Sequence, residues 1–243
     1  MDRIIRITLC IFFIVLVAFV APVLYTGYVG NAYRSSLVGT YTYSCAISTD
    51  ADLTNVTLFI PVPSNPRGNS PVIARYSSHE IAGIPTSWTT ELYDTGKGVL
   101  VKVSTPHVSV PAGTTPQKPY TVTISANISS GAPIDTRDPV ASSALFRPVQ
   151  GLSVISCPDT AAPGGRCSAY ASSVFARYES SPESSVHISS GLSGTESWNI
   201  FGPESGTYLT AFDVTLTGAQ DNWTPIRVSL EDSIGAAPPR IPS

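Results

Sequence analysis

Charge is scarce in this chain of 243 residues. Only 13% of the residues are charged and the formal net charge is −3, whereas soluble globular domains carry about 25% charged residues. The few Lys and Arg form no basic block, and the acidic residues form no tract. Nucleic-acid binding needs clustered Lys and Arg to replace the counterions of the phosphates. The composition therefore argues against a nucleic-acid partner.

Histidine is also scarce, with three in the chain, which limits the acid–base and metal chemistry available to it. The three histidines, His79, His107 and His187, have no second histidine or cysteine at the spacing of three or four residues that metal-binding helices use. The G-x-S-x-G motif of many hydrolases is also missing. We therefore predict no catalytic residue and no bound cofactor, and we interpret the histidines as surface or structural residues.

Acidic residues occur as close pairs in the sequence, among them Asp135 and Asp138. Glycosidases need two carboxyl groups on either side of a sugar cleft, and neighbours on one loop do not define such a cleft. A calcium site at Asp135 and Asp138 is less favoured than a local ion pair with Arg137, because calcium takes at least about six oxygen ligands. We predict no metal site, and a hydrolase built from distant carboxylates is the least favoured function.

Cysteine is rare, with four in the chain, but two of them are placed to form a disulfide. Cys157 and Cys167 bracket the Pro- and Gly-rich stretch CPDTAAPGGRC, which can turn back on itself. A disulfide closing this loop would contribute roughly 3 kcal/mol. Free thiols or a zinc site are less favoured, because the chain is expected to be exported and lacks a second ligand pair. Cys45 is expected to be a buried thiol, with pairing to Cys157 or Cys167 left open, and Cys10 an apolar filler or lipidation site.

The chain has one long apolar run, ITLCIFFIVLVAFVAPVLYTGYV from Ile7 to Val29, preceded by Arg3 and Arg6. A helix of this length reaches about 34 Å, enough to cross a hydrocarbon core of about 30 Å. We predict a transmembrane helix over 7–29, which contacts the lipid bilayer, with a short cytoplasmic segment 1–6 and a juxtamembrane linker 30–35. A cleaved secretory signal is the alternative, but its apolar core is typically about 7–15 residues long. Because basic residues favour the cytoplasmic side, the rest of the chain is expected outside the cell.

Beyond residue 36, apolar and polar residues alternate as in half-buried strands. A hairpin is expected around the turn DTGK, between strands 88–93 and 98–104. The other expected strands are 37–48, 55–62, 120–128, 168–178, 185–192, 197–201, 208–217 and 224–230. We predict an all-β fold, an antiparallel β-sandwich of the immunoglobulin-like or jelly-roll kind over 36–234, followed by a disordered tail 235–243. The turn-rich stretch 131–139 is interpreted as a crossover within one domain, although a boundary between two domains is the alternative.

Two kinds of surface chemistry are suggested by short patterns. The glycosylation pattern N-x-[ST] occurs at Asn55, Asn127 and Asn222, all on the expected outer side. The three tryptophans, Trp88, Trp198 and Trp223, could form a platform on which sugars stack, although aromatic residues more often fill the core of a sandwich.

The segments IPTSWTTELYDTGKGVLVKV, DTRDPV and CSAYASSVFARY resemble those of single-anchor ectodomain proteins of methanogenic archaea. That group has no established activity, so the resemblance implies only a location at the archaeal cell surface. We predict a single-pass protein of the cell membrane with an extracellular ectodomain. Its expected function is structural or protein-binding, without catalysis, and its expected partners are other envelope proteins or surface glycans. A carbohydrate-binding surface module is the alternative.

Overall fold

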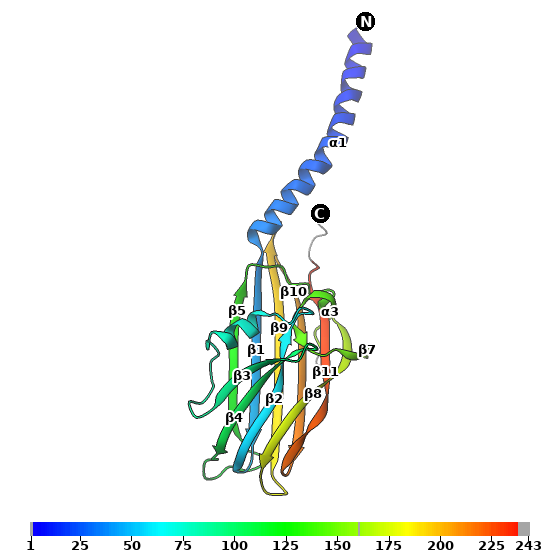
Figure 1. Cartoon of the computed structure of the whole chain (residues 1–243). Coiled ribbons are helices and arrows are strands. Elements are labelled where there is room, and N and C mark those ends of the chain that lie inside the picture. Colours follow the sequence, from blue (N-terminus) through cyan, green and yellow to red (C-terminus); the bar gives the residue numbers. More distant parts are fainter. Residues whose placement is uncertain (1, 160, 238–243) are drawn as a thin grey trace.

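The structure is a computed structural model, and it describes residues 2–159 and 161–237. A long helix extends from one end of a β-rich body (Figure 1). The helices are α1 (Asp2–Ser36), α2 (Pro71–Ser77) and α3 (Pro139–Ser142). The strands are β1 (Val38–Thr49), β2 (Leu53–Ser64), β3 (Thr89–Asp94), β4 (Val99–Val108), β5 (Tyr120–Ser130), β6 (Leu145–Phe146), β7 (Gln150–Val154), β8 (Arg166–Glu179), β9 (Ser185–Asn199), β10 (Pro203–Thr217) and β11 (Gln220–Gly235).

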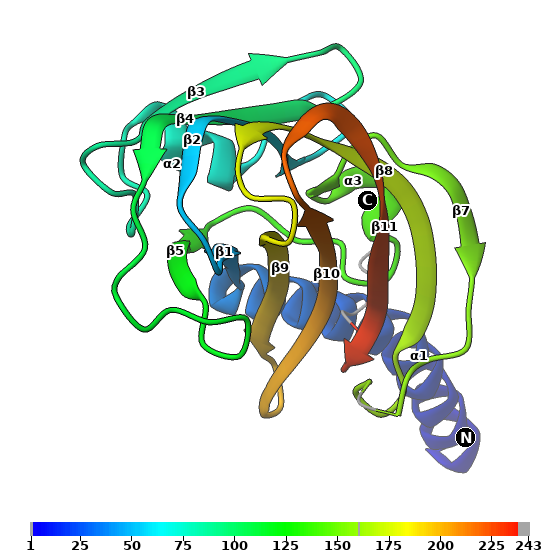
Figure 2. The ribbon, with the colours of Figure 1, turned by 90° about the horizontal axis from the view of Figure 1, so that it is seen from below.

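One continuous antiparallel sheet contains the main strands, in the order β3-β4-β2-β8-β11-β10-β9-β1-β5. Strand β6 pairs with β2, and β7 pairs with β8. The sheet curls so that its two ends approach each other (Figure 2). The predicted all-β, antiparallel character is confirmed. The immunoglobulin-like and jelly-roll sandwiches, however, consist of two packed sheets, whereas here continuous pairing gives a single curled sheet.

Alternation along the strands separates a buried inner face from a more polar outer face. In β9 the side chains of Val186, Ile188 and Leu192 are buried inside the curl, and the outward-facing residues that alternate with the buried ones are half-exposed. The sequence predicted two strands here, 185–192 and 197–201. The structure has one strand over Ser185–Asn199, because Gly194 and Glu196 occupy inward positions where an apolar residue was expected.

The gap between the two ends of the curled sheet is closed by α2 and the segment 78–88. Ala82 exchanges two backbone hydrogen bonds with Ser125 of β5, with N···O distances of 3.1 and 3.0 Å. On the inner side, the Tyr76 ring of α2 contacts Tyr43 of β1 at a centroid distance of 6.2 Å, and their hydroxyls are 3.3 Å apart. Helix and segment therefore link the edge that carries β3 to the edge strand β5.

The end of the curl nearest α1 is filled by the chain between β5 and β7. Ile134 and Phe146 of this segment are fully buried, and the Phe146 ring meets Phe212 at 5.0 Å. The hydroxyl of Tyr208 donates to the Ala144 carbonyl at 2.8 Å. This segment contains the turn-rich stretch 131–139, and its buried contacts make it part of the core.

Glu196 is a carboxylate buried beneath this segment, with only 1% of its surface exposed. Its Oε1 accepts a hydrogen bond from the Ile134 amide at 3.2 Å. Burial raises the pKa of Glu196, the nearby charge of Asp135 raises it further, and hydrogen bonds from Tyr33 and Ile134 act in the opposite direction. Compared with the unfolded chain, the folded state therefore shifts Glu196 toward its protonated form.

A pH-dependent stability follows from this raised pKa. The contribution of Glu196 is fully present below its unfolded pKa of about 4.3 and is lost as pH rises through the higher folded pKa. We expect Glu196→Gln, which cannot ionise, to be more stable than the wild type at neutral pH and to gain no such advantage at about pH 4. Thermal denaturation in mild detergent at a series of pH values would measure this. The exposed Glu183→Gln should follow the wild type, and parallel curves for all three proteins would contradict the prediction.

Helix α1 includes the whole predicted span 7–29 and is long and apolar enough to cross a membrane, a property that an anchor and a signal sequence share. The predicted linker 30–35 is helical instead, so only Leu37 separates the helix from β1. Ser36 ties the helix end to β9, since its Oγ accepts from the Asn199 amide at 2.9 Å. The predicted tail lies partly beyond the described residues, and its start, Gly235, is the last residue of β11.

Candidate functional site

The three tryptophans that could have formed a stacking platform lie apart in the fold. Trp198 is buried, with 2% exposed, and its indole N–H donates to Glu204 Oε2 at 3.1 Å. Trp88 is half-buried against the core. Trp223 is 54% exposed on β11. Of the three, only Trp223 offers an open ring to a ligand.

Trp223 belongs to a group of aromatic side chains on the outer face of the sheet, in which Trp223 and Tyr93 are exposed and Phe59 and Phe175 are half-buried. Strand pairing aligns Trp223 with Phe175 of β8, and Phe175 with Phe59 of β2. The same row continues from Phe59 to Lys102 of β4, and from Lys102 to Glu91 of β3. Five adjacent strands thus contribute one residue each to a single line across the sheet.

The row lies on the outer face because its residues alternate with buried ones. Phe59 stands between Leu58 and Ile60, which are 1% and 0% exposed and point into the core. Phe175 likewise stands between the buried Val174 and Ala176. An apolar ring on the outward phase of a strand is therefore the signal that could have identified these positions in the sequence.

Four rings, those of Phe59, Tyr93, Phe175 and Trp223, form what we call the aromatic face. The centroid of Phe59 lies 5.4 Å from Tyr93, 5.8 Å from Phe175 and 6.4 Å from Trp223. Phe175 and Trp223 are 5.4 Å apart. The planes are inclined by 37° to 70°, a range that includes favoured edge-to-face contacts. The rings pack against one another and form an uneven apolar surface, because their planes are inclined to each other.

Charged groups border the aromatic face on both sides. On the β3 side, Glu91 Oε2 accepts from the Tyr93 hydroxyl at 2.8 Å and from Lys102 Nζ at 3.2 Å. The hydrogen bond from Tyr93, followed by that from Lys102, lowers the pKa of Glu91. On the β11 side, Arg177 donates to Asp221 at 2.7 Å, and its guanidinium lies 5.7 Å from the Phe175 ring. Paired charges thus surround an apolar centre.

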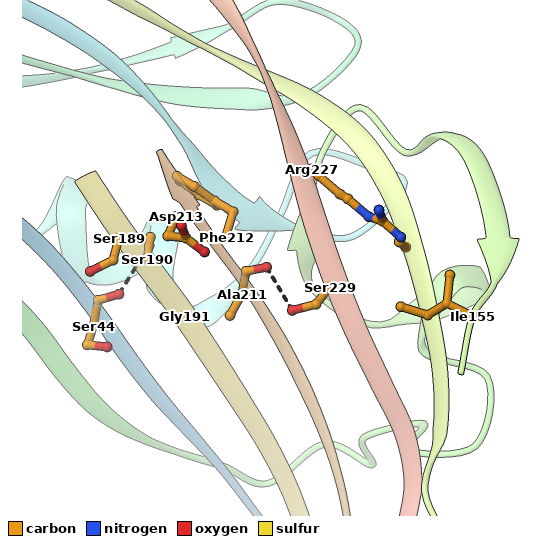
Figure 3. A pocket seen from close by; sticks show the side chains of 11 residues that line it. Ser44, Ile155, Ser189, Ser190, Gly191, Ala211, Phe212, Asp213, Arg227 and Ser229 are labelled. Carbon is orange, nitrogen blue, oxygen red and sulfur yellow. Dashed lines mark hydrogen bonds between the residues drawn. The ribbon is translucent and has the colours of Figure 1, made fainter. Parts of the chain in front are cut away.

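A second feature of the outer face is an open hollow of about 680 Å³ over β1, β9, β10 and β11 (Figure 3). Small side chains line most of it, and two of its hydroxyls bond to backbone carbonyls: Ser190 Oγ to Ser44 at 3.1 Å and Ser229 Oγ to Ala211 at 3.0 Å. These bonds join neighbouring strands. The hydroxyls therefore have a structural use, and the aromatic face is the stronger candidate for binding.

Asp135 and His187, considered above as a possible ligand or catalyst, each make local hydrogen bonds. Asp135 Oδ1 accepts from the amides of Arg137 and Asp138 at 3.1 and 2.9 Å, as in a turn. His187 Nδ1 lies 3.1 Å from the Thr215 hydroxyl on the next strand. Within residues 2–159 and 161–237, no group of three or more His, Cys, Asp and Glu is arranged to hold a metal ion.

The disulfide and the buried Cys45 are arranged as the sequence predicted. Cys157 and Cys167 form a disulfide, with an S–S distance of 2.01 Å. Cys45 is a free, buried thiol beside Tyr43, and burial raises its pKa to about 11. Because Cys157 and Cys167 are bonded to each other, the alternative pairing of Cys45 is excluded. Cys10 is free and exposed on α1.

The three candidate glycosylation sites are all exposed on the β-rich body. Asn55 has a left-handed backbone, with φ of 54°, and its Nδ2 donates to Glu179 at 3.2 Å. Asn127 lies on the edge strand β5, and Asn222 lies beside Trp223 on β11. Each side chain is accessible to a modifying enzyme, and glycosylation stays a prediction.

Comparisons with known proteins found no matching family model, no matching curated protein and no matching solved structure.

Proposed function

We propose that this protein is a single-pass surface protein whose ectodomain binds another protein of the cell envelope through the aromatic face. The observation that carries the proposal is the aligned row from Glu91 to Trp223, with apolar rings at its centre and paired charges at its borders. Protein interfaces have this composition: aromatic residues and Arg are enriched, the centre is apolar and the rim is polar.

Membrane attachment through α1 is part of the proposal. The helix is apolar over a length that suits a bilayer, and Arg3 and Arg6 before it favour a cytoplasmic N-terminus. The disulfide between Cys157 and Cys167 supports an oxidising exterior for the rest of the chain. The intact mass of protein purified from native membranes tests this part. The mass of the full-length chain supports a retained anchor, whereas the mass of a chain that starts near Tyr33 contradicts it.

Position in the fold favours contact with a partner that stands above the membrane. Trp223 lies close to the β10–β11 turn, at the end of the sheet opposite α1 (Figure 1). The aromatic face therefore extends toward the part of the ectodomain farthest from the helix. A neighbouring envelope protein would reach this face without contacting the bilayer.

Photo-cross-linking tests the proposed interface in living cells. With a photoreactive amino acid at Tyr93, which is 42% exposed at the border of the aromatic face, we expect cross-links to a specific envelope protein. The same probe at Ala211, on the outer face of β10, serves as the control and should give little product. Equal yields from both positions, or none from Tyr93, would contradict the proposed interface.

Truncating the indole should weaken this contact. Adding Trp223→Ala to the Tyr93 probe should reduce the cross-link yield about tenfold or more, because an aromatic hot spot contributes about 2 kcal/mol or more to binding. Leu209→Ala, which removes a side chain of 38% exposure elsewhere on the outer face, should leave the yield unchanged. Circular dichroism would verify that both variants are folded. A similar yield from both would show that Trp223 does not contribute.

Carbohydrate binding is the second candidate, and the 54% exposure of Trp223 favours it. An open indole with Arg177 and Asp221 nearby supplies a stacking surface and hydrogen-bonding groups. The inclination of 37° to 70° between ring planes favours a protein surface over a flat sugar-stacking platform. Cross-linked products that contain glycan without protein would support this second function instead.

A further inference from the structure

Phe201 is the most exposed aromatic side chain of the ectodomain, with 75% of its surface accessible. It lies in the turn between β9 and β10, at the end of the sheet that carries α1. It is outside the aromatic face and makes no contact with the hydrophobic core. An exposed phenylalanine at a turn has no structural need for its ring, so a contact outside the folded body would explain it.

The contacts that Phe201 makes with α1 indicate what its exposed ring faces. Its ring centroid is 6.3 Å from Tyr25, with planes inclined by 13°, and 6.2 Å from Tyr28. Both tyrosines belong to the last part of the apolar run 7–29. At a rise of about 1.5 Å per residue, Tyr25 lies about 6 Å inside the end of that run. Phe201 is therefore at the depth of the outer boundary of the proposed span.

The turn is held against the helix, so Phe201 cannot simply point elsewhere. Ser36 Oγ accepts from the Asn199 amide at 2.9 Å and donates to the Ala32 carbonyl of α1 at 2.6 Å, so the hydroxyl joins the turn to the helix. Tyr33 and Trp198 pack edge to face at 5.8 Å. Trp198 is in turn fixed by its hydrogen bond to Glu204, on the other side of the turn. These contacts hold the chain on both sides of Phe201, at Trp198 and Asn199 before it and at Glu204 after it.

We propose that the β9–β10 turn inserts Phe201 into the headgroup layer of the outer leaflet, giving the ectodomain a second contact with the bilayer beside α1. The inference rests on the proposed function, in which α1 is retained as an anchor. Tyrosine and tryptophan accumulate at this layer, and phenylalanine of interfacial segments is buried at the boundary between headgroups and acyl chains. The Phe201 ring would form a small belt there with Tyr25 and Tyr28. With two contact points, the tilt of the sheet relative to the membrane is fixed.

Fluorescence quenching by brominated lipids tests the insertion on the full chain in lipid bilayers. A tryptophan is introduced at Phe201, at Phe13 inside the span and about 9 Å from its first residue, or at Ala219 in the β10–β11 turn far from α1. Each variant is compared with the wild type, which supplies the signal of the three native tryptophans. We expect Phe201→Trp to lose at least about twofold more of its added fluorescence than Ala219→Trp, with bromine near the ester end of the acyl chain more effective than bromine near the methyl end. Phe13→Trp should show the reverse depth preference.

The outcomes separate the two proposals. If Phe13→Trp is quenched but Phe201→Trp behaves like Ala219→Trp, the helix spans the bilayer and the insertion of Phe201 is overturned, leaving the ring to a protein contact. If Phe13→Trp is not quenched, the membrane anchor is wrong, so the insertion of Phe201 fails together with the membrane part of the proposed function. Quenching of both positions with opposite depth preferences supports the insertion.

Discussion

Replacing Tyr208 by alanine is expected to lower the free energy of unfolding by about 3–5 kcal/mol. The ring is completely buried, and its hydroxyl donates to the Ala144 carbonyl at 2.8 Å in the segment that fills the helix-proximal end of the curl. The ring also lies against Gly194 of β9, where a methyl group would overlap it. Alanine would leave a cavity beside Gly194 and an unpaired carbonyl at Ala144.

Tyr208→Phe separates these two effects, because it keeps the ring and removes only the hydrogen bond. It should cost about 1 kcal/mol. Urea denaturation of the full chain in mild detergent, followed by the fluorescence of the native tryptophans, would measure both variants. Equal losses for alanine and phenylalanine would show that the ring does not support the core at this end.

Gly83→Ala is expected to have the second large effect, because Gly83 combines a left-handed backbone with a close approach. Its φ is +88°, and an added Cβ would overlap the carbonyl of Thr123 on β5. The adjacent Ala82 makes the two hydrogen bonds to Ser125 that link the opposite edges of the sheet. Alanine should therefore push the segment away from β5.

Gly96 provides a matched control, since its φ is +70° but no atom lies within 4 Å of an added Cβ. Gly96→Ala pays only the conformational cost of about 1–2 kcal/mol. Gly83→Ala should cost about 1–3 kcal/mol more, the usual range for overpacking. Hydrogen exchange would locate the change: the amides of Ala82 and Ser125 should lose protection in Gly83→Ala and keep it in Gly96→Ala. Equal stability of the two variants would rule out the tight approach.

The strands were largely predictable because each signal is local. Alternating residues such as Val101 and Val103 against Lys102 identify β4 without reference to any other part of the chain. The curled sheet was not predictable, since it depends on which strands pair. Strand β1 lies beside β9, and β2 beside β8, across more than a hundred residues of sequence. The alternating pattern shows which face of a strand is buried, but it does not show which other strands it pairs with.

The candidate site was only partly predictable for a related reason. Trp223 was identified by residue type, and the same criterion wrongly grouped it with Trp198, which the core encloses. Phe59 and Phe175 were overlooked because phenylalanine in a strand usually faces inward. Their outward phase is visible beside Ile60 and Val174, but their assembly with Trp223 required the register of three strands.

The direct connection of α1 to β1 has a mechanical consequence. Leu37 alone separates helix from strand, and β1 is paired over Gly39–Thr49 with β5 and over Val38–Thr49 with β9. A partner that pulls on the ectodomain would load β1 along its own axis, so its hydrogen bonds to both neighbours would have to shear together instead of opening one at a time. In the proposed function, the sheet would therefore transmit tension from a bound neighbour to the membrane without losing its strand pairing where α1 joins β1.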